Sequence, residues 1–167
     1  VFNLYDFAET IYSVVEELMK ANQLAFSCEV HVQHTFFYRD TTKLREVFFN
    51  ILSNACKYTA PGGSVRLLCE ELPGDKEDWG IIRTTITDTG IGMAEDFLPH
   101  VFDEFSRENN TTSTKIEGTG LGMSIVKKLV TFMEGSIEVT SKKGSGTTFV
   151  VSIPHRLAKD SEAAGSQ

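Results

Sequence analysis

Apolar residues recur at helical spacing in three segments of the chain. In residues 6–22, 41–59 and 121–133 they fall every three or four positions, a period that predicts amphipathic helices. The second segment follows Asp40, a residue type favoured at the N-cap of a helix, and ends at a Pro-Gly-Gly turn over 61–63. Each helix is therefore expected to bury one face against a core.

Strands are predicted in the segments between and after these helices. The candidate strands are 28–33, 36–38, 64–71, 79–87, 135–140 and 147–153. A short helix is expected near 94–98, followed by a turn around 100–105. Residues 106–119 are polar and aperiodic, and a loop of that length inside a compact domain is usually functional, often as a lid.

The order of these elements predicts the fold class. Strands and helices do not alternate strictly, which favours an α+β fold, a two-layer α/β sandwich with a mixed, mostly antiparallel sheet and helices on one face. We expect one domain over residues 1–154. The polar, small-residue segment 155–167 is expected to form a disordered tail or linker.

Composition narrows the classes of function. The 167 residues include 16 Lys or Arg and 23 Asp or Glu, and the net charge of −7 argues against a nonspecific nucleic-acid or anionic-membrane binder. No apolar run approaches the roughly 18 residues of a membrane span, and no signal peptide is expected. Cys28, Cys56 and Cys69 lack C-x-x-C spacing, which indicates reduced thiols in the cytosol rather than a disulfide framework or a zinc site.

The helix over 41–59 carries polar residues opposite its apolar face. Asn50, Asn54 and Lys57 fall within roughly 60° of one another, and Tyr58 lies at the border of the two faces. A solvated surface would explain this face. A ligand site explains it too, because an Asn carbonyl oxygen suits Mg²⁺, a Lys meets phosphate, and an aromatic ring stacks on a base.

Three glycine-rich segments are candidates for ligand loops. Asp88-Thr89-Gly90-Ile91-Gly92-Met93 follows a predicted strand, so it is either a turn or a site where the carboxylate accepts from the amine of adenine. Gly118-Thr119-Gly120-Leu121-Gly122 precedes a helix, where free amides suit an anion, although it matches neither the P-loop nor the dinucleotide pattern. The segment 144–149, GSGTTF, reads in isolation as a hairpin turn.

In their order and spacing, these motifs resemble the catalytic and ATP-binding domain of sensor histidine kinases. The wider superfamily, named GHKL and built on the Bergerat fold, includes DNA gyrase, heat-shock chaperone ATPases and mismatch-repair ATPases. The resemblance covers about residues 3–154. The matching segments are LREVFFNILSNACKYT (44–59, the N box), DTGIGM (88–93), VFDEFSR (101–107, the F box), GTGLGMSI (118–125) and GSGTTF (144–149).

The resemblance implies roles for residues that would contact ATP and Mg²⁺. Asn50 and Asn54 would hold Mg²⁺ and organise the phosphates, and Asn50 would thereby take part in catalysis. Lys57 would contact phosphate, and Tyr58 would lie against the nucleotide. Asp88 would bind the adenine amine with Gly90 and Gly92 beside it, and Thr147 would help the same site, directly or through water.

The resemblance also implies a mobile lid over the nucleotide. Phe102 and Phe105 would anchor its base, and Arg107 would stabilise charge near the γ-phosphate as a catalytic residue. Lys115 is a phosphate candidate inside the lid, or an ordinary solvated lysine. The glycine box that hinges the lid and offers amides to the phosphates comprises Gly118, Thr119, Gly120, Leu121 and Gly122.

One position favours phosphoryl transfer over ATP hydrolysis. ATPases of the superfamily place a Glu where Asn50 stands, as the base for the attacking water, and an Asn cannot act as a base. Glu46, one turn earlier, is better explained as a surface residue. Two other functions stay open: a nucleotide-gated interaction module without catalysis, and a true ATPase of the superfamily. The F box also departs from many relatives by carrying Asp103 and Glu104.

The four histidines (His31, His34, His100 and His155) lack the acidic neighbour and helical setting of a phosphoacceptor. The expected partners are therefore a separate dimerisation and histidine-phosphotransfer domain of the same kinase and a downstream response-regulator receiver domain. No nucleic acid and no membrane contact are expected. The chain is expected to be a monomeric, cytoplasmic part of a membrane-bound bacterial sensor, and its later motifs also resemble hybrid kinases.

Overall fold

The computed structural model of the chain describes residues 1–104 and 122–164. Within these ranges the chain forms one mixed sheet, four α-helices and one short 3₁₀ helix. The helices are α1 (Leu4–Ala21), α2 (Thr41–Lys57), η1 (Leu98–His100), α3 (Gly122–Phe132) and α4 (Asp160–Ala164). The strands are β1 (Phe2–Asn3), β2 (Ala25–His31), β3 (Phe36–Tyr38), β4 (Ser64–Pro73), β5 (Trp79–Asp88), β6 (Ser136–Ser141) and β7 (Thr147–Leu157).

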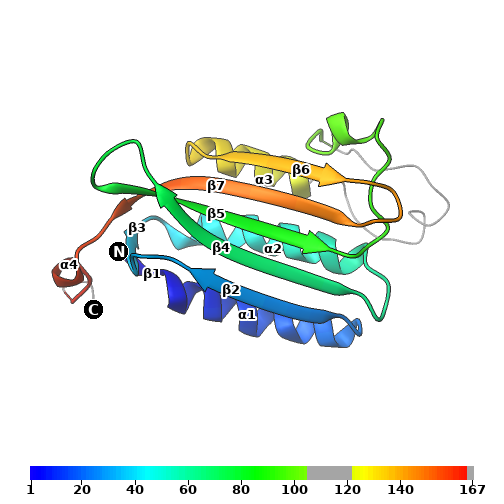
Figure 1. The fold of residues 1–167 in the computed structure, drawn as a ribbon, viewed down its shortest axis with the longest axis horizontal. Helices are drawn as coiled ribbons and strands as arrows, with labels where there is room; N and C mark the ends of the chain where they lie inside the picture. The colour runs from blue at the N-terminus through cyan, green and yellow to red at the C-terminus, as the bar shows by residue number, and fades with distance from the viewer. Residues whose placement is uncertain (105–121, 165–167) are drawn as a thin grey trace.

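The strands follow the order β1-β3-β7-β5-β4-β2, and β6 also pairs with β7. The β2–β4 pair is parallel, whereas the other strand pairs described are antiparallel. Helices α1, α2 and α3 lie on one face of the sheet (Figure 1). The expected α+β sandwich with a mixed, mostly antiparallel sheet is therefore confirmed.

The core lies between the sheet and these three helices. Along β5, Ile82, Thr84 and Ile86 are buried on the helix side while their neighbours are half-buried on the open side. Helix α2 packs between α1 and α3, and its Val47 and Ile51 are completely buried. Burying an aliphatic side chain of this size stabilises a fold by roughly 1.5–3 kcal/mol, so this apolar face holds α2 in place.

Side-chain caps explain where α1 and α2 begin. Asn3 Oδ1 accepts hydrogen bonds from the backbone N–H groups of Tyr5 and Asp6, at 2.9 and 3.2 Å. Asp40 Oδ1 accepts from Thr42 N at 2.9 Å, as the sequence predicts. Such caps contribute about 0.5–2 kcal/mol each.

The structure corrects two expectations about local structure. The helix predicted over 94–98 does not form. Residues 95–97 are a turn that leads into η1, which begins only at Leu98, because Pro99 lacks an N–H and fits only the first turn of a helix. The expected disordered tail from 155 is also wrong for its first part, since β7 continues to Leu157 and α4 covers Asp160–Ala164.

Long-range contacts explain why β7 continues past residue 154. His155 is only 2% exposed, and its Nδ1 accepts a hydrogen bond from Arg39 Nε at 3.2 Å. Arg39 also donates to Pro154 O, and Tyr38 and Leu157 both take part in the pairing of β3 with β7. None of the helices within 1–104 and 122–164 combines the length and hydropathy of a membrane span.

Candidate nucleotide-binding site

The predicted site residues on the sheet lie together where β5 ends and β7 begins. Asp88, the last residue of β5, pairs directly with Thr147, the first residue of β7. The loop 89–93 leaves the sheet at this point, on the right of Figure 1. Both side chains belong to the helix-facing set of their strands, and both are buried, at 8% and 6% exposure.

Asp88 is held by one of its two carboxylate oxygens. Its Oδ1 accepts from Gly90 N at 2.8 Å and from Thr147 N at 3.2 Å. Burial raises the pKa of this carboxyl, and the two backbone hydrogen bonds oppose that shift. Among the described residues no donor reaches Oδ2, so this oxygen is open to a donor from a ligand.

The loop after β5 needs its glycines because backbone packs tightly around them. A Cβ on Gly90 would lie 2.3 Å from the carbonyl oxygen of Tyr58. Gly92 has φ +69°, and a Cβ there would lie 2.1 Å from the carbonyl oxygen of Lys142. Ile91 N donates to Tyr58 O at 3.0 Å, which ties the loop to the end of α2.

Helix α2 brings its predicted polar face to the same end of the molecule. Asn50, Asn54 and Tyr58 are half-buried, whereas Lys57 is exposed. Asn50 Nδ2 donates to the carbonyl of Glu46 at 2.8 Å, and among the described residues no hydrogen-bond donor meets its Oδ1. That Oδ1 lies 3.2 Å from where a Cβ on Gly122 would stand, which places it beside the start of α3.

The donor set on α2 fits a magnesium ion that is bound mainly through phosphate. Mg²⁺ takes oxygen ligands and usually keeps waters or phosphate oxygens in its coordination sphere. Two neutral amide oxygens, from Asn50 and Asn54, meet this chemistry. Within the described residues no group of three or more His, Cys, Asp or Glu side chains forms a metal site.

The part of the F box that the structure describes is anchored to the core. The Phe102 ring packs edge-on against Phe149, with centroids 6.4 Å apart, and Lys127 Nζ lies 5.7 Å from the Phe102 centroid. The two unusual acids are paired: Asp103 with His100 at 2.9 Å and Glu104 with Lys128 at 2.6 Å. The Glu104 carboxylate is therefore paired with a cation, whereas Asp103 contacts a histidine on the exposed surface.

Several predicted site residues lie outside the described residues. These are Phe105, Arg107, Lys115, Gly118, Thr119, Gly120 and Leu121. Gly122, the last glycine of its motif, is the first residue of α3 and lies near Asn50.

Sequence reasoning missed Ser141, the last residue of β6. Its Oγ accepts from Met93 N at 2.8 Å and lies 2.8 Å from Thr147 Oγ1. This serine therefore ties the loop after β5 to the start of β7. No motif marks it, and only the register of the β6–β7 hairpin, which pairs Ser141 with Thr147, reveals its place.

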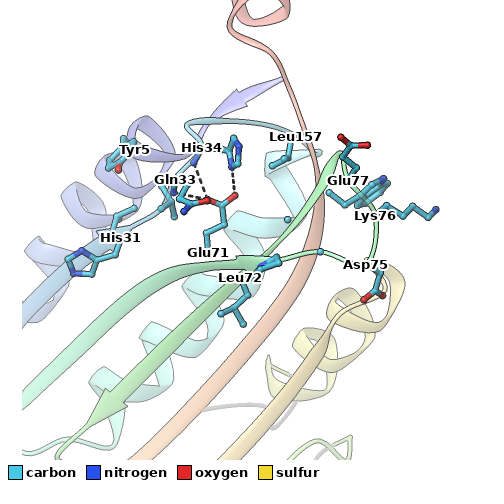
Figure 2. A pocket seen from close by; sticks show the side chains of 16 residues that line it. Tyr5, His31, Gln33, His34, Glu71, Leu72, Asp75, Lys76, Glu77 and Leu157 are labelled. Carbon is cyan, nitrogen blue, oxygen red and sulfur yellow. Dashed lines mark hydrogen bonds and ion pairs between the residues drawn. The ribbon is translucent and has the colours of Figure 1, made fainter.

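A separate cleft of about 820 Å³ lies at the opposite end of β5, near Trp79. Figure 2 shows Glu71 pointing toward His34 and Gln33 across this cleft. The Glu71 carboxylate is almost fully buried and accepts hydrogen bonds from the backbone N–H groups of Gln33 and His34 and from His34 Nδ1, at 2.7 to 3.0 Å. Its partners are all part of the loop after β2, so this carboxylate serves to hold that loop.

Comparison with known proteins identifies the family. The family model of histidine kinase-, DNA gyrase B- and HSP90-like ATPases matches residues 39–157. The autoinducer 2 sensor kinase/phosphatase LuxQ of Vibrio parahaemolyticus is 41% identical over 138 residues, which cover 83% of this chain. The chain spans 15% of the length of LuxQ.

Solved structures show the same fold. Full-length ShkA in complex with AMPPNP matches with a TM-score of 0.74 and 24% identity, over 94% of this chain and 31% of ShkA. The histidine kinase ThkA, in complex with the response regulator protein TrrA, matches with a TM-score of 0.68 and 22% identity, over 92% of this chain and 40% of ThkA. With the family match over 39–157, the chain belongs to the family of histidine kinase-, DNA gyrase B- and HSP90-like ATPases.

Proposed function

We propose that this domain binds Mg-ATP and donates the γ-phosphoryl group to a histidine on a separate dimerisation and phosphoacceptor domain in two-component signalling. The observation that carries the proposal is the buried Asp88 carboxylate, which among the described residues is held by Gly90 N and Thr147 N through Oδ1 alone. Its second oxygen is left as an acceptor beside the end of α2, the helix that carries Asn50 and Asn54.

Asp88 would select the base. The 6-amino group of adenine donates hydrogen bonds, whereas guanine carries an acceptor oxygen at that position. An ionised carboxylate can only accept, so it favours adenine and disfavours guanine. Gly90 and Gly92 let backbone approach the ring, and the half-buried Tyr58 lies at the junction of this loop with α2.

Asn50 and Asn54 would hold Mg²⁺ through their side-chain oxygens, with phosphate oxygens completing the coordination. When bound, the ion neutralises charge on the transferring phosphoryl group. Lys57 would add a positive charge near the phosphates, and the backbone at Gly122 would approach them closely. Phe102 would anchor the base of the lid. The same proposal includes Phe105, Arg107, Lys115 and the glycine box 118–121, which lie outside the described residues.

Transfer to protein is favoured over hydrolysis by the chemistry at Asn50. An amide has no basic lone pair that could take a proton from water, and its nitrogen already donates to Glu46 O. Positioning and charge neutralisation are what phosphoryl transfer asks of this domain. The acceptor nitrogen, and any carboxylate that activates it, come from the partner domain.

The partners follow from the same proposal. Besides the phosphoacceptor domain, a response-regulator receiver domain is the downstream partner, in line with the ThkA–TrrA complex. The AMPPNP complex of ShkA supports an adenine nucleotide as the ligand. We place the domain on the cytoplasmic side of a sensor, as a monomer when isolated.

Calorimetric titration tests nucleotide binding. A nonhydrolysable ATP analogue with Mg²⁺ should bind, and the GTP analogue should not. Asp88→Asn should weaken the ATP analogue roughly 10- to 150-fold, the equivalent of the 1.5–3 kcal/mol of a charge-assisted hydrogen bond. Asp78→Asn, at the other end of β5, is the matched control and should leave affinity unchanged. If neither nucleotide binds the folded protein, an interaction module without nucleotide is the better explanation.

A second experiment separates kinase from ATPase. The domain alone should turn ATP over very slowly, and should transfer phosphate to a supplied phosphoacceptor domain that carries the histidine. Asn50→Glu should gain hydrolysis, because it places a base near the attacking water. Rapid hydrolysis by the parent, or binding without transfer, would contradict the kinase proposal and favour an ATPase or a nucleotide-gated module.

A further inference from the structure

Three polar side chains form a row across neighbouring strands beside the proposed adenine site. Ser141 on β6 pairs with Thr147 on β7, which pairs in turn with Asp88 on β5. The three strands lie side by side at this end of the sheet (Figure 1). Side chains of directly opposed residues share one face of a sheet, and here it is the face that also carries α2.

The hydrogen bonds of Ser141 fix the direction of each hydroxyl in the row. Ser141 Oγ has one hydrogen to donate, and Gly146 O lies 3.0 Å away in position to accept it. Lys142 N reaches the same carbonyl only at 3.5 Å, longer than an ordinary N–H···O hydrogen bond. This geometry favours donation from Ser141 Oγ to Gly146 O, which can only accept.

With that hydrogen used, the 2.8 Å contact to Thr147 requires Thr147 Oγ1 to be the donor. Ser141 Oγ then accepts twice, from Thr147 Oγ1 and from Met93 N, and its hydrogen-bonding capacity is full. Thr147 has spent its only hydroxyl hydrogen. Toward a ligand it can offer lone pairs only.

From this geometry we infer that Ser141 is a specificity-determining positioning residue, which holds the Thr147 hydroxyl as a hydrogen-bond acceptor beside the Asp88 carboxylate. The inference rests on the proposed binding of an adenine nucleotide. Thr147 Oγ1 and Asp88 Oδ2 then form a pair of acceptors for a 6-amino purine, Thr147 acting directly or through one water. A 6-oxo purine presents an acceptor to the same pair and is rejected.

The test compares two nucleotides in calorimetric titrations with Mg²⁺: a nonhydrolysable ATP analogue and the matching inosine analogue, which carries oxygen in place of the 6-amino group. Ser141→Ala frees the Thr147 hydroxyl to rotate and donate. We expect the preference for the amino over the oxo nucleotide to fall about three- to tenfold, the size of one ordinary hydrogen bond. Ser141→Thr, which keeps the hydroxyl, should retain the preference of the parent for the amino nucleotide.

Matched variants test whether Ser141 affects the nucleotide preference through the Thr147 hydroxyl. Ser136→Ala removes an exposed serine from the other end of β6 and should leave the preference unchanged. Thr147→Val should lower the preference, Thr147→Ser should retain it, and adding Ser141→Ala to Thr147→Val should cause no further loss. If Ser141→Ala does not fold, Ser141→Cys takes its place, because a thiol is only a weak hydrogen-bond acceptor; it should also lower the preference, and an unchanged preference would overturn the inference.

The outcomes separate this inference from the proposed function. If Ser141→Ala weakens both nucleotides equally, Ser141 only holds the loop, and the inference is overturned while nucleotide binding stands. Full additivity of the changes at 141 and 147 also overturns it. If the parent domain binds neither nucleotide, the proposed function fails first and this inference falls with it.

Discussion

Replacing Asp88 with Asn is expected to stabilise the ligand-free domain while it weakens nucleotide binding. Asp88 is buried, with only 8% of the residue exposed, and this burial raises the pKa of its carboxyl although two amides donate to Oδ1. The ionised form is therefore a cost to the folded state. Asn has nearly the same shape, and its own Oδ1 can still accept from Gly90 N and Thr147 N.

The sign of the pH dependence follows from the raised pKa. A carboxyl with a raised pKa in the folded state binds its proton more tightly there than in the unfolded chain. As pH rises from the unfolded pKa, about 3.9, through the folded pKa, this proton is lost and the free energy of unfolding falls. Each unit of difference corresponds to about 1.36 kcal/mol. Above the folded pKa the cost is complete, so the stabilisation by Asp88→Asn should grow with pH through this window and then level off.

Urea unfolding at several values from pH 4 to pH 8 measures the effect, with nucleotide affinity measured on the same samples. At pH 8 the variant should unfold at higher urea than the parent, with an unchanged m-value, yet bind the ATP analogue more weakly. Asp78→Asn, which removes an exposed carboxylate paired with Arg156, is the control for a general effect of charge. If Asp88→Asn unfolds at lower urea at pH 8, the charge stabilises the fold and the reasoning is wrong.

Three further predictions concern buried or strained positions. Burial, with a smaller effect of the neighbouring Arg39 cation, lowers the pKa of His155 to about 3. The free energy of unfolding should therefore fall as pH drops from about 6.5 toward 3, and His155→Gln should flatten that decline in urea unfolding. Gly92→Ala should destabilise the fold and weaken nucleotide binding, because the alanine Cβ would lie 2.1 Å from the carbonyl oxygen of Lys142. Gly144→Ala, at φ +85° but with no atom within 4 Å of the new Cβ, should lower the free energy of unfolding only by the roughly 1–2 kcal/mol of the left-handed conformation, as thermal unfolding can show. Burial raises the pKa of Cys69 to about 12, so a thiol reagent at pH 8 should label the half-buried Cys28 first and Cys69 only on unfolding; rapid labelling of Cys69 in the folded protein would contradict this.

Elements set by local chemistry could be predicted from the sequence. The periodicity of α2 and its Asp40 cap specify where the helix begins and which face enters the core, and both agree with the structure. The polar face of Asn50 and Asn54 follows from the same period. The end of the same helix meets the loop after β5 at Tyr58, and the roles of Asn50 and Asn54 toward ATP and Mg²⁺ stay predictions.

Features set by contacts distant in sequence could not be predicted. His155 looks like the start of a polar tail, and its burial depends on Arg39, which lies 116 positions earlier. Ser141 looks like an ordinary strand residue, and its importance depends on a register that brings Met93 and Thr147 to the same hydroxyl. In each case a partner distant in sequence satisfies a polar residue, the buried His155 or the half-buried Ser141, and periodicity carries no signal for such pairs.

The two halves of the proposed site depend on different parts of the fold. The adenine end is formed by Asp88 and Thr147, which paired strands in the sheet hold in fixed register. The phosphate end depends instead on the spacing of two helices, because Asn50 on α2 faces Gly122 at the start of α3. A shift of α3 relative to α2 would therefore alter the placement of Mg²⁺ and the phosphates while leaving base recognition intact.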